Sequence, residues 1–421
     1  MALPKILQLV TGTALSRRSW QDICQDLLRL KDEATVLRLA TELLRRYQAF
    51  EPAEKLAFFQ HLLTEFRVDP EALREAIDAY LAEPDPWNVQ RINRASLPSR
   101  RNLFEILNMS PGGTPVLLQM RADLAVMTRN TPELRAVDSD LEILFRNWFN
   151  RGFLNLEKID WTTPAFVLEK LIKYEAVHEI SGWDDLRQRV STGRRCYAFF
   201  HPALPSEPII FVQVALVKSL VANVSEVLGE HAEVIAEDEA NTAIFYSISN
   251  CQKGLVGIAF GDLLIKQVAE QISAELPQIK TFATLSPVPG FNKWLGSTDA
   301  EALMSEAETQ LVGEVLQAPT TVLDLHADGQ SLLTRLCAYY LLHSRRGDGP
   351  SDPVARFHLR NGARLERINW LGDSSERRLG ESAGLLVNYV YDLDTVTRNH
   401  ETYVYDHGVV ASNAVSSLAK R

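Results

Sequence analysis

A serine and a histidine that lie far apart in the chain are the residues best suited to act together on a substrate. Ser286 follows the short apolar segment 281–285 and stands before the first proline of LSPVPG. Because a residue before proline is driven into an extended conformation, we expect Ser286 at the mouth of a strand, beyond the last hydrogen bond of the ladder. His358, in RFHLRNGA, supplies an imidazole. From its own stretch alone, Ser286 could equally cap a turn.

A hydroxyl and an imidazole together support two kinds of chemistry. In the first, the imidazole deprotonates the hydroxyl for attack on an acyl carbon. Ser286 lacks the G-x-S-x-G elbow that exposes such a nucleophile, which argues against a hydrolase. In the second, both groups orient a carboxylate and the imidazole delivers a proton to a carbanion. Decarboxylation of an acyl thioester needs this second chemistry, because the thioester carbonyl itself accepts the electrons and no metal or organic cofactor is required.

A glycine-containing turn lies between a predicted strand and a predicted helix. The turn is NCQKGLVG, residues 250–257, and apolar residues recur every four positions in the helix from 260 to 272. Gly254 and Gly257 let a backbone approach a ligand closely, and amides at a helix start can hold a phosphate. Strand, turn, helix and the next strand form one crossover unit, which predicts that the turn and Ser286 share the carboxyl edge of a sheet.

The elements that must position these residues alternate between strands and helices after residue 159. Strands are expected at 196–202, 209–217, 242–249, 281–285 and 385–393, helices at 163–174 and 331–343, and a short strand or connector at 320–325. The run 209–217 is almost wholly apolar, as is typical of a central strand covered on both faces. The last strand carries Tyr391 near its end.

His358 precedes an Asn-Gly pair, Asn361-Gly362, which is a strong signal for a two-residue hairpin turn. The pair predicts strands on both sides of it. In that hairpin His358 would share a face with Arg356 and Arg360, and this polar company favours an accessible imidazole.

The first part of the chain has the pattern of a helical bundle. Ser19 and Asp22 resemble a capping box before an amphipathic stripe, and Asp69 with Pro70 marks another helix start. Short connections between such stripes are typical of antiparallel neighbours in a bundle. We therefore divide the chain into a helical domain, 1–158, and an α/β domain, 159–421.

Composition narrows the class of protein. The 421 residues are 46% hydrophobic, enough for a large core, and the formal net charge of −10 argues against non-specific nucleic-acid binding. The longest apolar run is far shorter than a bilayer-spanning helix, and no signal peptide or transit peptide is evident. The four cysteines are scattered without metal-ligand spacing, which indicates reduced thiols in a cytoplasm-like compartment and no metal site.

Several motifs resemble the malonyl-CoA decarboxylase family in the same order along the chain. They are HPALPSEPIIFVQVAL, AIFYSIS, GLVGIAFGDLLIKQV, LSPVPGF, PVARFHLRNGA, RINW and NYVY, with GFLNLEKIDW upstream of them. The resemblance covers roughly the last three-fifths of the chain, too long and too ordered for a chance motif match. It implies an α + α/β fold, in which a helical bundle that mediates oligomerisation precedes a mixed-sheet domain similar to the acyl-CoA N-acyltransferase (GNAT) fold.

The same resemblance assigns functions to residues. The turn residues Lys253, Gly254, Leu255, Val256 and Gly257 would hold the pyrophosphate of coenzyme A, which is bound only as part of the substrate. Gly254 departs from the GNAT pattern, which usually has Arg or Gln there, so phosphate contact would depend more on backbone amides.

Ser286 and His358 correspond to the family's catalytic serine and histidine, and Tyr391 to a tyrosine near the site. His201 is either a ligand contact or a structural residue beside Pro202. Ala259 stands where animal members carry a glutamate, so an acid there cannot be essential to the shared mechanism.

The resemblance implies decarboxylation of malonyl-CoA to acetyl-CoA and carbon dioxide. Ser286 and His358 would orient the carboxylate, and His358, directly or through a water, would protonate the enolate. The alternatives are a GNAT-type N-acyltransferase acting on an amine and a non-catalytic acyl-CoA-binding protein. We expect a cytoplasmic homo-oligomer with no membrane partner. One chain does not separate dimer from tetramer or decide whether methylmalonyl-CoA is accepted.

Overall fold

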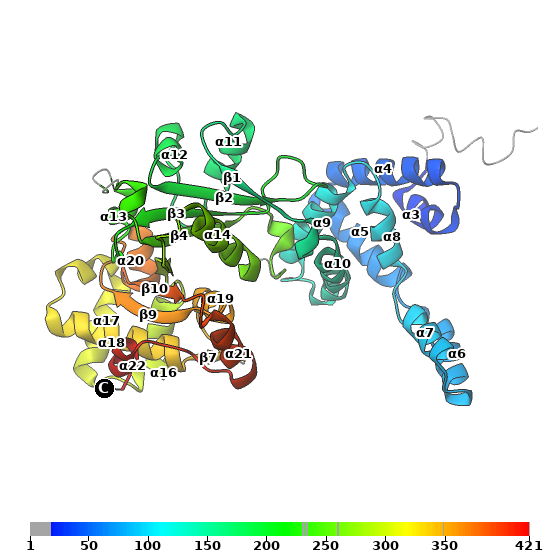
Figure 1. The fold of residues 1–421 in the computed structure, drawn as a ribbon. Coiled ribbons are helices and arrows are strands. Elements are labelled where there is room, and N and C mark those ends of the chain that lie inside the picture. Colours follow the sequence, from blue (N-terminus) through cyan, green and yellow to red (C-terminus); the bar gives the residue numbers. More distant parts are fainter. Residues whose placement is uncertain (1–17, 230–231, 233–234, 259–260, 348, 421) are drawn as a thin grey trace, which may run out of the picture. The chain divides into compact units, whose positions relative to one another are not determined.

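The computed structural model describes residues 18–229, 232, 235–258, 261–347 and 349–420 (Figure 1). The chain divides into two compact units. The first is Met1–Asn155 with Phe200–Glu207 and Gln252–Ile258, and the second is Leu156–Phe199, Pro208–Cys251 and Ala259–Arg421. The first unit is mainly helical and the second is built on a mixed sheet, so the predicted fold class is confirmed. A domain boundary after residue 158 stays a prediction.

The helices of the first unit begin where the capping residues predict. The Ser19 hydroxyl accepts the Asp22 amide, and the Asp69 carboxylate accepts the amides of Glu71 and Ala72. These helices are α3 (Trp20–Arg29), α4 (Glu33–Ala49), α5 (Pro52–Glu65), α6 (Pro70–Ala82), α7 (Pro86–Ala95), α8 (Arg100–Asn108), α9 (Gly113–Met127) and α10 (Arg135–Trp148), with short 3₁₀ turns at Pro132–Leu134 and Arg151–Phe153. No helix among the described residues is both long and apolar enough to cross a bilayer.

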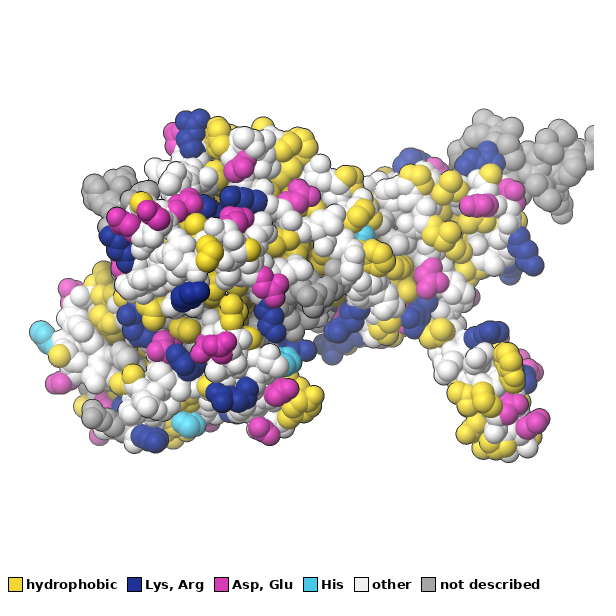
Figure 2. Space-filling model, viewed as in Figure 1, with side chains coloured by type: hydrophobic (Ala, Val, Ile, Leu, Met, Phe, Trp, Pro, Cys, Tyr) yellow, Lys and Arg dark blue, Asp and Glu magenta, His cyan; other side chains and the backbone are white. Residues whose placement is uncertain are grey.

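Helices α6 and α7 pack mainly on each other and leave apolar side chains in solvent. Leu81 and Trp87 are 70% and 72% exposed, and Ile77 and Val89 are also exposed. Ala76 is the buried residue of α6, and α7 has none among its residues. Figure 2 shows hydrophobic side chains gathered on this hairpin. We call these four exposed residues the hairpin patch.

The second unit is organised by a sheet whose described strands run in the order β1, β2, β3, β4, β5, β10, β6, with β9 also paired to β10. The strands are β1 (Asn155–Ile159), β2 (Arg194–Phe200), β3 (Ile210–Val217), β4 (Thr242–Asn250), β5 (Thr281–Thr284), β6 (Ser286–Pro287), β9 (Arg364–Asn369) and β10 (Leu386–Tyr391), and β7 (Arg345–Arg346) pairs separately with β8 (Gly349–Pro350). Every residue of β3 is buried, as predicted for a central strand. The strand predictions in this region are therefore largely confirmed.

The helices of the second unit and their neighbours have these bounds: α11 (Ala165–Tyr174), α12 (Trp183–Arg189), α13 (Ser225–Leu228), α14 (Gly261–Glu275), α15 (Phe291–Leu295), α16 (Thr298–Glu301), α17 (Glu306–Gln317), α18 (Ala327–His343), α19 (Pro353–Arg360), α20 (Glu376–Ser382), α21 (Val396–Asp406) and α22 (Asn413–Leu418). Two 3₁₀ helices, η3 (Glu237–Glu239) and η5 (Pro319–Asp324), join them. The prediction of a short strand at 320–325 is thus wrong, because these residues lie mostly in η5, and the alternative prediction of a connector is confirmed.

Two parallel strands separate beside Ser286. Strands β4 and β5 pair in parallel as far as Phe245 opposite Thr284. Strand β4 then continues to Asn250 beside β3, whereas the chain after β5 continues as β6 beside β10. The divergence leaves Ser286 paired on one side only.

Ser286 nevertheless remains within the ladder, contrary to the prediction that it lies beyond the last ladder bond. It lies opposite Val387, and Pro287 lies opposite Leu386. Strand β6 is at the end of the strand order, and an edge strand tolerates proline because no neighbour needs its missing N–H.

The hairpin predicted around Asn361-Gly362 is wrong on its first side. Residues Pro353–Arg360 form helix α19, and only β9 after the pair is a strand. The Asp352 carboxylate accepts the amides of Val354 and Ala355, and Pro353 occupies the first helical turn, so the helix start outweighs the hairpin signal. Gly362, with φ of +81°, allows the chain to leave the helix.

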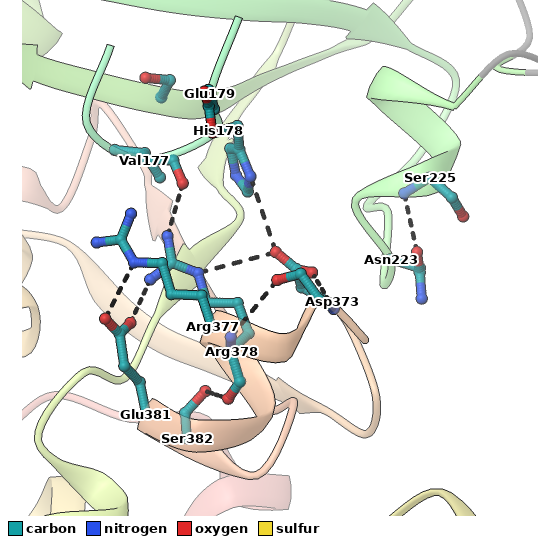
Figure 3. Close-up of polar contacts among 12 residues, drawn as sticks. Val177, His178, Glu179, Asn223, Ser225, Asp373, Arg377, Arg378, Glu381 and Ser382 are labelled. Atoms are coloured by element: carbon teal, nitrogen blue, oxygen red, sulfur yellow. Dashed lines mark hydrogen bonds and ion pairs between the residues drawn. The ribbon is translucent and has the colours of Figure 1, made fainter. Parts of the chain in front are cut away.

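Arginine side chains hold the segment that follows α11 (Figure 3). Arg377 and Arg378 of α20 donate to the carbonyls of Ala176 and Val177, at 2.9 and 2.8 Å. The buried Arg378 also bonds Glu381 at 2.6 Å and lies 3.8 Å from Asp373. These contacts tie α20 to the segment beside the sheet.

Candidate active site

Ser286, His358 and Tyr391 form one buried chain of hydrogen bonds within the second unit. The Ser286 Oγ lies 3.0 Å from His358 Nε2, and His358 Nδ1 lies 2.8 Å from the Tyr391 hydroxyl. The exposed fractions of the three residues are 5%, 3% and 2%. The structure thus brings together residues that are 72 positions apart (Ser286 and His358) and 33 positions apart (His358 and Tyr391) in the sequence.

Three elements deliver these side chains. Ser286 comes from β6, Tyr391 from the end of β10, and His358 from the last turn of α19. The buried Asp352 joins two of them, because its carboxylate caps α19 and also accepts the Gly290 amide at 3.1 Å, in the turn after Ser286. This shared carboxylate links the start of α19 to the turn after Ser286.

The direction of the Ser286 hydroxyl determines the tautomer of the ring. The hydroxyl donates to Thr284 Oγ1 at 2.8 Å. Since a hydroxyl has one proton, the Ser286 oxygen is left to accept from His358 Nε2–H. Nδ1 must then accept from the Tyr391 hydroxyl. With the bonds in this direction the hydroxyl does not donate to the imidazole, as the nucleophile of a serine hydrolase does.

His358 is uncharged in this environment. Burial, which penalises the charged ring, lowers the pKa of His358 from 6.5 to about 3. Tyr389 stacks on the ring with centroids 4.6 Å apart and planes at 25°. The prediction of an accessible imidazole is therefore wrong: the hairpin model placed the ring on a polar face, whereas α19 places it in the core.

Acid should destabilise the protein through His358. The folded pKa of about 3 lies below the ordinary 6.5, so the stabilisation is complete above pH 6.5 and is lost as the pH falls toward 3. The loss from pH 6.5 to about pH 5 amounts to about 2 kcal/mol. We expect His358→Gln to be less acid-sensitive than the unmodified protein in urea unfolding at these two pH values.

The matched control is His326→Gln, which alters an exposed histidine at the start of α18. His178 has a pKa lowered to about 4, mainly by burial, and supplies residual acid sensitivity in every variant. Equal acid sensitivity of His358→Gln and the control would contradict a neutral His358.

The glycine turn belongs to the first unit, where α9 and α10 lie against it. Inside the turn, the Leu255 amide donates to the Gln252 carbonyl and the Val256 amide to the Lys253 carbonyl. These two amides are therefore already used. Gly257 is exposed with φ of +85°, a conformation that favours glycine, and Lys253 is exposed beside it. Ala259 lies outside the described residues.

His201 is held by the first unit through both ring nitrogens. Nδ1 accepts the Ala203 amide at 3.1 Å, so Nε2 carries the proton that goes to the Trp148 carbonyl, also at 3.1 Å. The ring also lies 4.5 Å from that of Phe149. These contacts favour the structural role over the ligand contact.

Sequence reasoning missed Thr284, Tyr389 and Asp352. Residues two apart on a strand share a face, so Thr284 could have been paired with Ser286 and Tyr389 with Tyr391. Asp352 before Pro353 was a recognisable cap. Among the described residues, no group of three or more His, Cys, Asp or Glu is arranged to hold a metal ion.

The fold and site define a class: an α + α/β protein with a buried, hydrogen-bonded hydroxyl, imidazole and phenol. Comparison with known proteins is more specific. The model of the malonyl-CoA decarboxylase C-terminal domain matches residues 152–421, and that of the N-terminal domain matches residues 66–149. The chain belongs to the malonyl-CoA decarboxylase family, whose members are carboxy-lyases.

Solved structures and a curated relative agree. The crystal structure of malonyl-CoA decarboxylase from Agrobacterium vitis is 45% identical, with a TM-score of 0.90 over 96% of this chain and 100% of that chain. The enzyme from Rhodopseudomonas palustris is 44% identical, with a TM-score of 0.85 over 94% and 98%. The mitochondrial malonyl-CoA decarboxylase of Anser anser anser is 37% identical over 363 residues, 79% of this chain and 71% of that protein.

Proposed function

We propose that this protein decarboxylates malonyl-CoA to acetyl-CoA and carbon dioxide at Ser286 and His358. The observation that carries the proposal is the hydrogen-bonded chain from Thr284 through Ser286 and His358 to Tyr391. It offers donors to a carboxylate without preparing the serine as a nucleophile. Family membership supplies the substrate.

In the proposed reaction the malonyl carboxylate replaces two bonds of this chain. The Ser286 hydroxyl turns to it from Thr284 Oγ1, and His358 Nε2–H donates to it in place of the Ser286 oxygen. These bonds turn it perpendicular to the thioester plane, so that the breaking carbon–carbon bond overlaps the carbonyl. The electron pair passes into the thioester as an enolate, and carbon dioxide leaves. The thioester is the electron acceptor, so the proposal includes no cofactor.

The enolate carbon needs one proton, which His358 supplies in our proposal. A carboxylate beside the neutral ring favours proton uptake from solvent, because opposite charges close together stabilise the charged form. The imidazolium then protonates the carbon, directly or through a water, and becomes neutral again. The proton taken up goes to Nδ1, so the Tyr391 hydroxyl changes there from donor to acceptor and keeps the ring oriented through both steps.

We propose that Lys253 and the backbone of residues 254–257 bind the coenzyme A pyrophosphate. Leu255 and Val256 use their amides inside the turn, so the exposed Gly257 amide is the donor we favour. We also propose a cytoplasmic enzyme, a compartment that suits four buried cysteines.

To test the function, the purified protein is incubated with malonyl-CoA. The thioesters are followed by mass spectrometry and free coenzyme A by a thiol assay. Acetyl-CoA without free thiol supports decarboxylation. Free coenzyme A would indicate hydrolysis, and thiol release only with an added amine would indicate an N-acyltransferase. Binding without turnover would leave a non-catalytic acyl-CoA-binding protein.

We propose that the helical region forms homo-oligomers through the hairpin patch. A two-helix hairpin with so few buried residues gains stability by burying its apolar side chains against another copy. The double variant Leu81→Glu, Trp87→Glu should lower the mass measured by light scattering. The control is Tyr405→Glu, which alters an exposed aromatic residue of α21 and should not lower the mass. An unchanged mass for the double variant would contradict this interface.

A further inference from the structure

Arg121 of α9 binds the glycine turn through two of its backbone carbonyls. Its Nη1 donates to the carbonyls of Gly254 and Val256, at 2.7 and 3.0 Å. Its Nε bonds Asp138 at 3.1 Å, and its Nη2 lies 3.7 Å from Glu142. The side chain is 7% exposed. A buried guanidinium with this many acceptors has one fixed orientation.

Helix α9 also explains why residue 254 is glycine. A Cβ on Gly254 would lie 2.2 Å from the backbone oxygen of Leu118 in α9, a clash that backbone atoms cannot relieve. Gly254 is therefore a packing residue, and the turn is seated on the helix by direct backbone contact. The Arg or Gln usual in the GNAT pattern would not fit there.

The two carbonyl bonds determine where the turn's amides point. In a trans peptide the C=O and the following N–H point in opposite directions. Since the Val256 carbonyl is directed at Arg121, the Gly257 N–H is directed away from it. Val256 and Gly257 are exposed, so this amide lies in an exposed part of the turn.

We propose that Arg121 is a positioning residue for coenzyme A: by fixing the Val256 carbonyl it aims the Gly257 amide at a phosphate of the ligand. The inference rests on the proposed function of the turn. It gives the helical region a role in substrate binding in addition to assembly.

The test compares two substrates that differ in their phosphates. Malonyl-CoA carries the pyrophosphate, and malonyl-pantetheine does not. We expect Arg121→Met to raise the Kd of coenzyme A, measured by calorimetry, and the KM of malonyl-CoA about tenfold, the size of one charge-assisted hydrogen bond. The kcat/KM of malonyl-pantetheine should be unchanged. Arg121→Lys keeps the charge but lacks the planar guanidinium, so its Kd and KM should lie between those of the unmodified protein and of Arg121→Met. If Arg121→Met does not fold, Arg121→Lys gives the same comparison of the two substrates.

Arg100→Met is the matched control. Arg100 is also buried in the first unit and bonds Asp140 at 2.7 Å. Arg100→Met should leave the kcat/KM of both substrates unchanged. The inference would be overturned if the Arg121 variants lowered the kcat/KM of malonyl-CoA and of malonyl-pantetheine equally, or lowered neither. Coenzyme A binding is measured without turnover, so a protein that binds as predicted yet forms no acetyl-CoA would refute the proposed function and still support the inference.

Discussion

His358→Ala should lower the kcat for acetyl-CoA formation by about 10²–10⁴-fold, the usual contribution of a positioned general acid. The variant removes the donor at Nε2 and also the proton source for the enolate carbon. It leaves the proposed coenzyme A contacts in place, so the KM for malonyl-CoA should change little. Steady-state assays by mass spectrometry of acetyl-CoA measure both quantities.

The control for this variant is His61→Ala, which removes a partly buried ring packed edge-on against Trp20 and Phe66 in the first unit. It should keep kcat within a few-fold of the unmodified protein. A correctly folded His358→Ala protein that retained most of its activity would refute the assigned role of the imidazole.

Ser286→Ala should lower kcat by about 10²–10³-fold, as expected when one oriented donor is lost from a buried site. Ser286→Cys should be nearly as poor, because a thiol is a weak hydrogen-bond donor. If Ser286 were a nucleophile, Ser286→Cys should keep much of its activity, because a thiol beside an imidazole is a competent nucleophile. The pair of variants therefore separates the two chemistries.

Ser382→Ala is the matched serine control for this pair. Ser382 is fully buried in the same unit, and its hydroxyl oxygen lies 3.0 Å from the Leu385 carbonyl and 3.3 Å from the Arg378 carbonyl, either of which can accept its proton. Its kcat should be close to that of the unmodified protein. An active Ser286→Cys variant that accumulates an acyl–enzyme would contradict the orienting role.

The strands around the site could be predicted from sequence because their apolar runs are local. β3, β4 and β10 carry continuous or alternating apolar residues, and their signals do not compete with others. α19 was missed because two valid local signals disagreed. The Asn361-Gly362 pair favours a hairpin, but the Asp352 cap and Pro353 favour a helix before it, and packing decided between them.

The network around Ser286 could be predicted only in part. Tyr391 and His358 were assigned through the family resemblance, and no local pattern shows that the two side chains meet. The support of the glycine turn by Arg121 is further from reach, because the bonded residues are 133 positions apart in the chain. Contacts between distant segments depend on how the elements pack, which periodicity does not report.

The central claim, non-covalent decarboxylation at Ser286 and His358, is tested most directly in a single turnover. Excess protein is mixed with malonyl-CoA, and acetyl-CoA and the intact protein mass are followed together. We predict one acetyl-CoA for each malonyl-CoA consumed, no free thiol, and no change in the protein mass at any time. A transient acyl adduct on Ser286, or acetyl-CoA formation that survives the loss of both Ser286 and His358, would contradict the account.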